Sequence, residues 1–475
     1  MKFSSTILLS IFTALTSKVA ADCTYVSGNY YCDEVSAVVY NNVGYSGSYS
    51  DVTNMDESSC ECTQESVSFE GTNSPLDEEL SVHFRGPLKL LQFGVYYPSS
   101  SSSVSKRDES NDSLVEEDCS TTKHVHHVHK RDPATQVVEI TETVYVNANG
   151  QLITNSASTT STTSQSVQTA SLVNAAQVIE SSSTKDTSST TTLTTSSSTS
   201  TSTSTSSSTT KSSSSTESSA SATSTSTSSS AWNRVSYYTP GSTTNVTFLN
   251  TLGGSAGSGT WSSCFGNSLS YLAANGVDST SAATALDEVT IGSDTEYVIF
   301  SGSSCSDSSV GDCGYYRTNI PAYHGFGGSE KIFVFEFEMP HETASSSASN
   351  PDMPAIWLLN AKIPRTLQYG SSSCSCWSTG CGELDLFEIL SESSEKLISH
   401  IHDGQGDNGS TYGGGGSQDY FVRPTSSSLK AAVIFNSDKS IHIVQLDDST
   451  SFSSGLDSTT VSSWLSKTGG SATLS

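Results

Sequence analysis

The chain has 475 residues, a formal net charge of −27 and only 34% hydrophobic residues. Such a negative charge argues against nucleic acid or an anionic membrane surface as the principal partner, because both would repel the protein. It does not disfavour a neutral partner such as a polysaccharide. The length allows two or three domains.

The N-terminus has the pattern of a secretory signal peptide. Lys2 supplies the positive charge, residues 7–15 form a short apolar run, and Val19-Ala20-Ala21 resembles a cleavage site. The apolar run is too short to span a bilayer, and no other stretch approaches ~20 apolar residues. The C-terminal residues lack the hydrophobic tail of a lipid-anchor signal. We therefore expect residues 1–21 to be a signal peptide and the protein to be secreted without a membrane anchor.

The cysteines favour an oxidising compartment and suggest how the chain divides. Four lie near the mature N-terminus, six lie in the C-terminal half, and Cys119 stands alone between the dibasic pairs Lys106-Arg107 and Lys130-Arg131. Cutting at both pairs would leave even cysteine counts in the two flanking pieces, which predicts proprotein processing. Two chance dibasic pairs remain the alternative.

Disulfides are favoured over a metal site for the closely spaced cysteines of the C-terminal half. Cys374, Cys376 and Cys381 offer three thiols of the kind that bind zinc. In a secreted chain, however, such cysteines usually form disulfides, and their pairing cannot be deduced from the sequence. We expect neither a metal nor a cofactor.

Composition divides the mature chain into three parts. Residues 22–155 are predicted to form a small, cysteine-stapled, β-rich module without a catalytic constellation, and this part includes both dibasic pairs. Residues 156–230 are dominated by Ser and Thr, which cannot bury enough apolar area to offset the entropy of ordering. That segment is predicted to be a disordered, O-glycosylated linker.

Residues 231–475 are predicted to be an all-β domain. Short runs rich in aromatic and β-branched residues recur between Gly, Asn, Asp and Ser, as in residues 296–300, 331–339, 355–359 and 441–446. Many short strands without long helical periodicity indicate a β-sandwich of single-domain size.

The most informative stretch is residues 381–390, which holds three carboxylates among large apolar residues. Glu383 and Asp385 share one face of a strand, whereas Glu388, five positions after Glu383, would point to the other face. One extra residue, a β-bulge near Phe387, would return Glu388 to the first face. Alternation alone usually marks a solvent-exposed face, as we expect for Glu336 and Glu338.

Two carboxylates flanking a scissile bond are the machinery of glycoside hydrolysis, and a retaining enzyme holds them ~5–5.5 Å apart. Four strand positions separate Cα atoms by roughly 13 Å, so the strand must curve and the side chains must lean inward. Asp385 between the two glutamates would help to keep them in different protonation states.

Two motifs resemble glycoside hydrolase family 16. They are Pro354-Ala355-Ile356-Trp357-Leu358-Leu359 and Gly382-Glu383-Leu384-Asp385-Leu386-Phe387-Glu388. The resemblance implies that Glu383 is the nucleophile, Asp385 the assisting acid and Glu388 the acid/base. It also implies that Trp357 lines the sugar cleft by stacking, and that His402, rather than His400, supports the site. The alternatives are a core tryptophan and two exposed strand histidines.

The whole layout resembles a fungal cell-wall group described as probable circularly permuted 1,3-β-glucanases. This resemblance implies a concanavalin-like jelly roll, permuted strand order and wall β-glucan as the partner, with no obligate protein partner. The cysteine-rich insert at residues 373–381 is not typical of family 16. A retaining β-1,3-glucanase is the leading hypothesis. A glucan transglycosylase of the same fold and a non-catalytic glucan-binding wall mannoprotein remain the alternatives.

Overall fold

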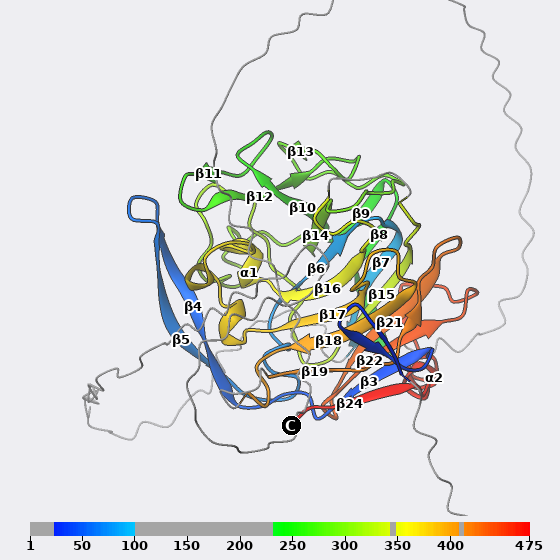
Figure 1. Ribbon diagram of the computed structural model, residues 1–475. Coiled ribbons are helices and arrows are strands. Elements are labelled where there is room, and N and C mark those ends of the chain that lie inside the picture. Colours follow the sequence, from blue (N-terminus) through cyan, green and yellow to red (C-terminus); the bar gives the residue numbers. More distant parts are fainter. Residues whose placement is uncertain (1–22, 100–230, 343–347, 408–412) are drawn as a thin grey trace, which may run out of the picture. The chain divides into compact units, whose positions relative to one another are not determined.

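Two β-sheets stack against each other in the computed structural model of the chain (Figure 1). The structure describes residues 23–99, 231–342, 348–407 and 413–475. Within these ranges one sheet has 11 strands and the other has 9. The pairings between strands are antiparallel except for one parallel pair, between β24 and β3. The structure therefore confirms the all-β prediction.

The first sheet, called the site sheet below, runs through its strands in a fixed spatial order. That order is β11 (Trp261–Ser262), β12 (Gly266–Leu272), β10 (Val246–Gly253), β14 (Glu296–Ser301), β6 (Leu80–Arg85), β16 (Ala355–Asn360), β17 (Glu383–Glu388), β18 (Lys396–His402) and β19 (Gly415–Gly416), with β13 (Ser279–Thr280) beside β12 and β20 (Phe421–Val422) beside β18.

The second sheet, called the back sheet below, has its own order. That order is β23 (Gly455–Leu456), β8 (Trp232–Thr239), β7 (Lys89–Pro98), β15 (Lys331–Glu338), β21 (Leu429–Asn436), β22 (Ser440–Leu446), β3 (Ala37–Asn41) and β24 (Gly470–Thr473), with β9 (Ser242–Thr244) beside β8.

The remaining elements are two hairpins and four short helices. The hairpins are β1 (Thr24–Val26) with β2 (Asn29–Tyr31) and β4 (Gly47–Asp56) with β5 (Glu61–Phe69); the helices are α1 (Lys362–Arg365), α2 (Ser458–Leu465) and the 3-10 turns η2 (Ser372–Cys374) and η3 (Trp377–Thr379). In the described part of the chain, no helix is both long enough and apolar enough to cross a membrane.

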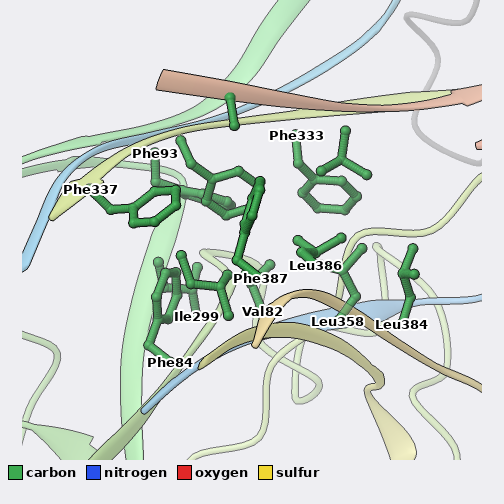
Figure 2. Packing of buried hydrophobic residues seen from close by; sticks show 14 of the residues in the cluster. Val82, Phe84, Phe93, Ile299, Phe333, Phe337, Leu358, Leu384, Leu386 and Phe387 are labelled. Carbon is green, nitrogen blue, oxygen red and sulfur yellow. The ribbon is translucent and has the colours of Figure 1, made fainter. Parts of the chain in front are cut away.

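The core lies between the two sheets because each sheet turns its apolar face inward. A single cluster of buried hydrophobic residues takes members from both sheets. Figure 2 shows Phe93, Phe333 and Phe337 of the back sheet facing Val82 and Phe84 of the site sheet. The finer prediction of a concanavalin-like jelly roll remains a prediction.

The N-terminal residues supply interior strands to both sheets. Strand β6 lies between β14 and β16, β7 lies between β8 and β15, and β3 lies between β22 and β24. The predicted separate module at residues 22–155 is thereby corrected, because its described part, residues 23–99, shares both sheets with the C-terminal residues. The apolar faces of these strands are buried against partners distant in sequence, which local patterns cannot reveal.

The disulfides also join the two predicted pieces. Cys60 pairs with Cys264 and Cys62 pairs with Cys374, so the even cysteine counts do not reflect separate pairing within each piece. The other disulfides in the described residues are local, and they link Cys23 with Cys32, Cys305 with Cys313, and Cys376 with Cys381.

The segment between the two described parts leaves and re-enters one sheet at adjacent positions. Pro98 at the end of β7 pairs with Trp232 at the start of β8. The amide of Ser99 donates to the carbonyl of Ala231 over 2.8 Å. Residues 100–230 are therefore an insertion into a β-hairpin. The predicted signal peptide, both dibasic pairs and the predicted linker at residues 156–230 lie outside the described residues.

Candidate active site

Strand β17 contains the predicted bulge. Opposite β16, the register passes from Phe387 paired with Ile356 to Asp385 paired with Trp357, so β17 has one residue more than its partner there. A register shift also separates Asp385 and Glu388 opposite β18. Both Leu386 and Phe387 enter the core between the sheets. Glu388 is therefore returned to the outer face that Glu383 and Asp385 occupy.

Neighbouring strands place charged partners around these three acids. His402 on β18 is the register partner of Glu383. Its Nε2 lies 3.3 Å from Oδ2 of Asp385. Burial alone would lower the pKa of His402, but the hydrogen bond and charge of Asp385, together with Glu383 and Glu388, raise it to about 9. His402 is therefore a cation at neutral pH.

Arg85 at the end of β6 is the partner of Glu388. Its Nη2 lies 3.4 Å from Oε1 of Glu388, and its Nε donates to the carbonyl of Met353 over 2.8 Å. Both Arg85 and Glu388 have mostly buried side chains. Sequence reasoning missed Arg85, because 303 positions separate it from Glu388 and no local pattern marks it.

Burial and a neighbouring negative charge favour the protonated forms of the two glutamates. Burial, with the charge of Asp385, raises the pKa of Glu383 to about 8 and that of Glu388 to about 7. His402 lowers both pKa values, and Arg85 lowers that of Glu388, without cancelling the effect of burial. The protonated form of each glutamate is therefore favoured to a higher pH than for an exposed glutamate.

The structure distinguishes the two histidines of β18. Burial lowers the pKa of His400 to about 4, so that its ring is neutral, and its Nδ1 is buried without a hydrogen-bond partner. His400 is the register neighbour of Asp385, whereas His402 makes the ion pair with that acid. The choice of His402 over His400 therefore agrees with the contacts.

Trp357 does not offer a sugar platform. Its side chain is only 5% exposed, and its ring stacks on His83 with ring centroids 5.0 Å apart. It packs in a hydrophobic cluster that includes Tyr49 and Phe69 of the β4–β5 hairpin. The prediction of a stacking platform is corrected: this hairpin covers the outer face at Trp357, and the alternative of a buried tryptophan holds.

A different tryptophan, Trp377, reaches the carboxylates. Its Nε1 donates to Oε2 of Glu383, and its ring lies 6.5 Å from the ring of His402. The side chain is 42% exposed. Trp377 belongs to the cysteine-rich insert, inside the loop that the Cys376–Cys381 disulfide closes, and the nearby Cys374 is bonded to β5. The unusual insert was visible in the sequence, but the direction of this ring was not.

The cysteines do not form a metal centre. Cys374 and Cys376 belong to two different disulfides, which removes the zinc alternative for the insert. Among the described residues, the sulfurs of Cys305 and Cys313 lie with a ring nitrogen of His324 within 4.8 Å of one another. These two sulfurs are bonded to each other, so they are not the thiolates that bind transition metals.

Comparison with known proteins identifies the family. The C-terminal model of the cell wall protein YJL171C/Tos1 family matches residues 230–464, and the N-terminal model matches residues 36–98. The chain belongs to the Tos1 family of cell wall proteins. The N-terminal match spans β3, β6 and β7, the strands that complete the two sheets.

Relatives in the Tos1 family carry names that state an activity. A Saccharomyces cerevisiae protein named probable circularly permuted 1,3-beta-glucanase TOS1 is 55% identical over 100% of this chain and 99% of its own length. A Candida albicans protein of the same name is 56% identical over the whole of both chains. An Arthroderma benhamiae protein named probable circularly permuted 1,3-beta-glucanase is 31% identical over 89% of this chain and 87% of its own. No solved structure matches the chain.

Proposed function

We propose that this protein is a glycoside hydrolase of the fungal cell wall that cleaves β-1,3-glucan with retention of configuration. The observation that supports the proposal most strongly is the bulge in β17, which returns Glu388 to the face of Glu383 and Asp385. The names of the relatives favour β-1,3-glucan over other polysaccharides. The family of cell wall proteins favours secretion to the wall.

The proposed reaction has two steps that share one pair of carboxyl groups. Glu383 attacks the anomeric carbon while Glu388 gives its proton to the departing glycosidic oxygen, and a glycosyl ester forms on Glu383. In the second step Glu388 takes a proton from water, and the hydroxide attacks the same carbon and releases Glu383. The raised pKa of Glu388 favours the protonated form that a general acid needs at the start of this cycle.

The neighbouring residues have separate tasks in this proposal. The Trp377 N–H group and the His402 cation favour the charged form of Glu383, as a nucleophile requires. Arg85 stabilises the carboxylate that Glu388 becomes after it gives up its proton. Asp385 holds His402 in place. The raised pKa values do not by themselves distinguish nucleophile from acid/base, so that assignment rests on the resemblance of the motif to family 16.

The test is product analysis of the full secreted protein with β-1,3-linked, mixed-linkage and chitin oligosaccharides. We expect cleavage of the β-1,3-linked substrates, with the β-anomer seen first by NMR. Products longer than the substrate would identify a transglycosylase, in which a sugar hydroxyl instead of water attacks the glycosyl ester. Binding of glucan without turnover would identify a non-catalytic wall protein, and initial release of the α-anomer would overturn the retaining mechanism.

A further inference from the structure

The segment between α1 and β17, residues 366–382, carries two aromatic side chains that are exposed to solvent yet anchored at their polar ends. Tyr369 is 60% exposed and Trp377 is 42% exposed. Each donates a hydrogen bond to a carboxylate of the site sheet. A large exposed ring held by its polar end is suited to stacking on a ligand, because its faces stay free while its position is set.

Tyr369 is anchored at Glu296, the first residue of β14. Its hydroxyl lies 2.8 Å from Oε2 and 3.1 Å from Oε1 of that carboxylate. Glu296 is the register partner of Arg85, and Arg85 forms the ion pair with Glu388. Burial raises the pKa of Glu296, whereas Arg85 and the Tyr369 hydroxyl lower it. Tyr369 is therefore linked to the catalytic acids through one arginine.

The segment is fixed to the β4–β5 hairpin around Trp377. The Cys62–Cys374 disulfide joins it to β5, and the Cys376–Cys381 disulfide closes the turn that holds Trp377. The hydroxyl of Thr379 accepts from the amide of Ser50 over 2.9 Å, and Gln64 donates to the carbonyl of Ser375 over 3.2 Å. These attachments hold the Trp377 ring beside Glu383.

The two anchor points lie at opposite corners of the acidic face. Three steps across the sheet separate β14 from β17, and the bulged strand separates Glu388 from Glu383. At ~4.8 Å between strands and ~3.3 Å between residues, Glu296 and Glu383 are roughly 19 Å apart on a flat sheet. A span of this size accommodates several sugar units rather than one.

We propose that residues 366–382 form a two-point aromatic clamp for a glucan chain. Trp377 stacks on the sugar that Glu383 attacks, and Tyr369 stacks on a more distant sugar beyond Arg85 and Glu388. This inference rests on the proposed function and adds that the substrate is an extended chain bound internally. Binding energy from the distant sugar then serves the reaction, so short substrates are cleaved poorly.

The experiment compares variants of the full secreted protein on β-1,3-linked oligosaccharides of increasing length. Trp377→Ala is expected to lower kcat/KM on every substrate. Tyr369→Ala is expected to lower it by about tenfold, the value of one aromatic contact, only on chains long enough to reach that ring. Trp261→Ala is the matched control, because Trp261 is 58% exposed and lies on β11, the edge strand six steps across the site sheet from β17.

Tyr369→Phe separates stacking from electrostatics, since it keeps the ring and removes the hydrogen bond to Glu296. The clamp predicts that the Phe variant retains most of the activity on long chains. An equal loss in the Phe and Ala variants, or a loss independent of chain length in Tyr369→Ala, would overturn the clamp and leave an electrostatic role through Glu296.

Failure of the clamp can be distinguished from failure of the proposed function. In the Glu388→Gln background, calorimetry with a long β-1,3-linked oligosaccharide measures binding without turnover. The clamp predicts weaker binding after Tyr369→Ala in this background, even if the unmodified protein proves to be inactive. Unchanged affinity would contradict the clamp, whether or not the protein is a hydrolase.

Discussion

Strands β15 and β17 both alternate acids with large apolar residues, yet they place those acids in different surroundings. On β15, Glu338 lies 2.9 Å from Nζ of Lys89, and Glu336 accepts hydrogen bonds from Gln92 and Ser428. On β17, Glu383 and Glu388 share their face with Asp385, and their pKa values are raised. Each β15 acid has a partner of its own, whereas the β17 acids are crowded together.

A third acid on the same face of the strand, rather than the alternation of acids with apolar residues, distinguishes the candidate site on β17 from the solvated face of β15. The bulge in β17 adds Glu388 to the row, and the three carboxylates share two cations, His402 and Arg85. Strand β15 also has a register irregularity, opposite β7, but no third acid follows it. A strand of ordinary composition thus becomes a candidate site when its acids outnumber the nearby cations.

The largest expected effect comes from neutralising matched glutamates on the two strands. Glu383→Gln should abolish turnover of β-1,3-glucan, and Glu388→Gln should lower kcat/KM by about 10²–10⁴-fold, as expected when a general acid is lost. Glu336→Gln on β15 should leave activity near that of the wild type. A comparable loss in Glu336→Gln, with all three variants folded by circular dichroism, would remove the distinction between the strands.

The second effect concerns the cation beside each strand. Arg85 lowers the pKa of Glu388, so Arg85→Gln should raise that pKa and move the alkaline limb of the kcat/KM profile to higher pH. Lys89→Gln removes the corresponding cation from Glu338 and should leave the limb in place. If both variants shift the limb alike, Arg85 acts through general charge rather than through contact with Glu388.

A smaller effect is expected on stability. The folded pKa of Glu383 lies above its unfolded value, so its favourable contribution is complete below about pH 4.5 and is lost as pH rises through about 8. Glu383→Gln cannot titrate, so the variant does not lose this stability as pH rises. The difference in Tm between the variant and the wild type should therefore grow by at least a few degrees between pH 5 and pH 9. Glu336→Gln is the control, and a constant difference for Glu383→Gln would contradict the raised pKa.

The smallest effect is expected from shortening the insertion beside β15. Residues 100–230 leave from β7 and return at β8, in the back sheet, where Ser99 and Ala231 are already hydrogen-bonded. Replacing them with a short Gly/Ser turn should not lower Tm, because a shorter loop closes at a smaller entropic cost. The shortened protein should also keep the kcat/KM of the wild type on β-1,3-glucan. Loss of secretion in a folded form would show that the insertion supports the sandwich.

Local pattern was enough to predict β17 and its bulge. Glu383 and Glu388 are five positions apart, so a regular strand would turn one of them into the core. A bulge avoids burying that charge, and it places both glutamates on the same face as Asp385. Short β-prone runs were enough for the all-β class. The family comparison confirms the resemblance of the whole layout to the fungal cell-wall group, whereas the relation of the two motifs to glycoside hydrolase family 16 stays a prediction.

Residues that meet only through tertiary structure were not predictable. Arg85 and His83 come from β6, which precedes residues 100–230 in the sequence, whereas β17 follows them. Trp357 was expected to face sugar, but the β4–β5 hairpin that covers it is far away in sequence. Trp377 lies beside Glu383 because two disulfides fix the insert, and sequence alone does not determine their pairing.

The most direct test of the central claim is to trap the covalent intermediate. A β-1,3-linked disaccharide with fluorine at C2 and a good leaving group reacts with the nucleophile of a retaining enzyme and is released slowly. After proteolysis, mass spectrometry should find the added sugar on Glu383 of β17, and none in the Glu383→Gln variant. Sugar attached to Glu388, or turnover of β-1,3-glucan without any labelled peptide, would contradict the account.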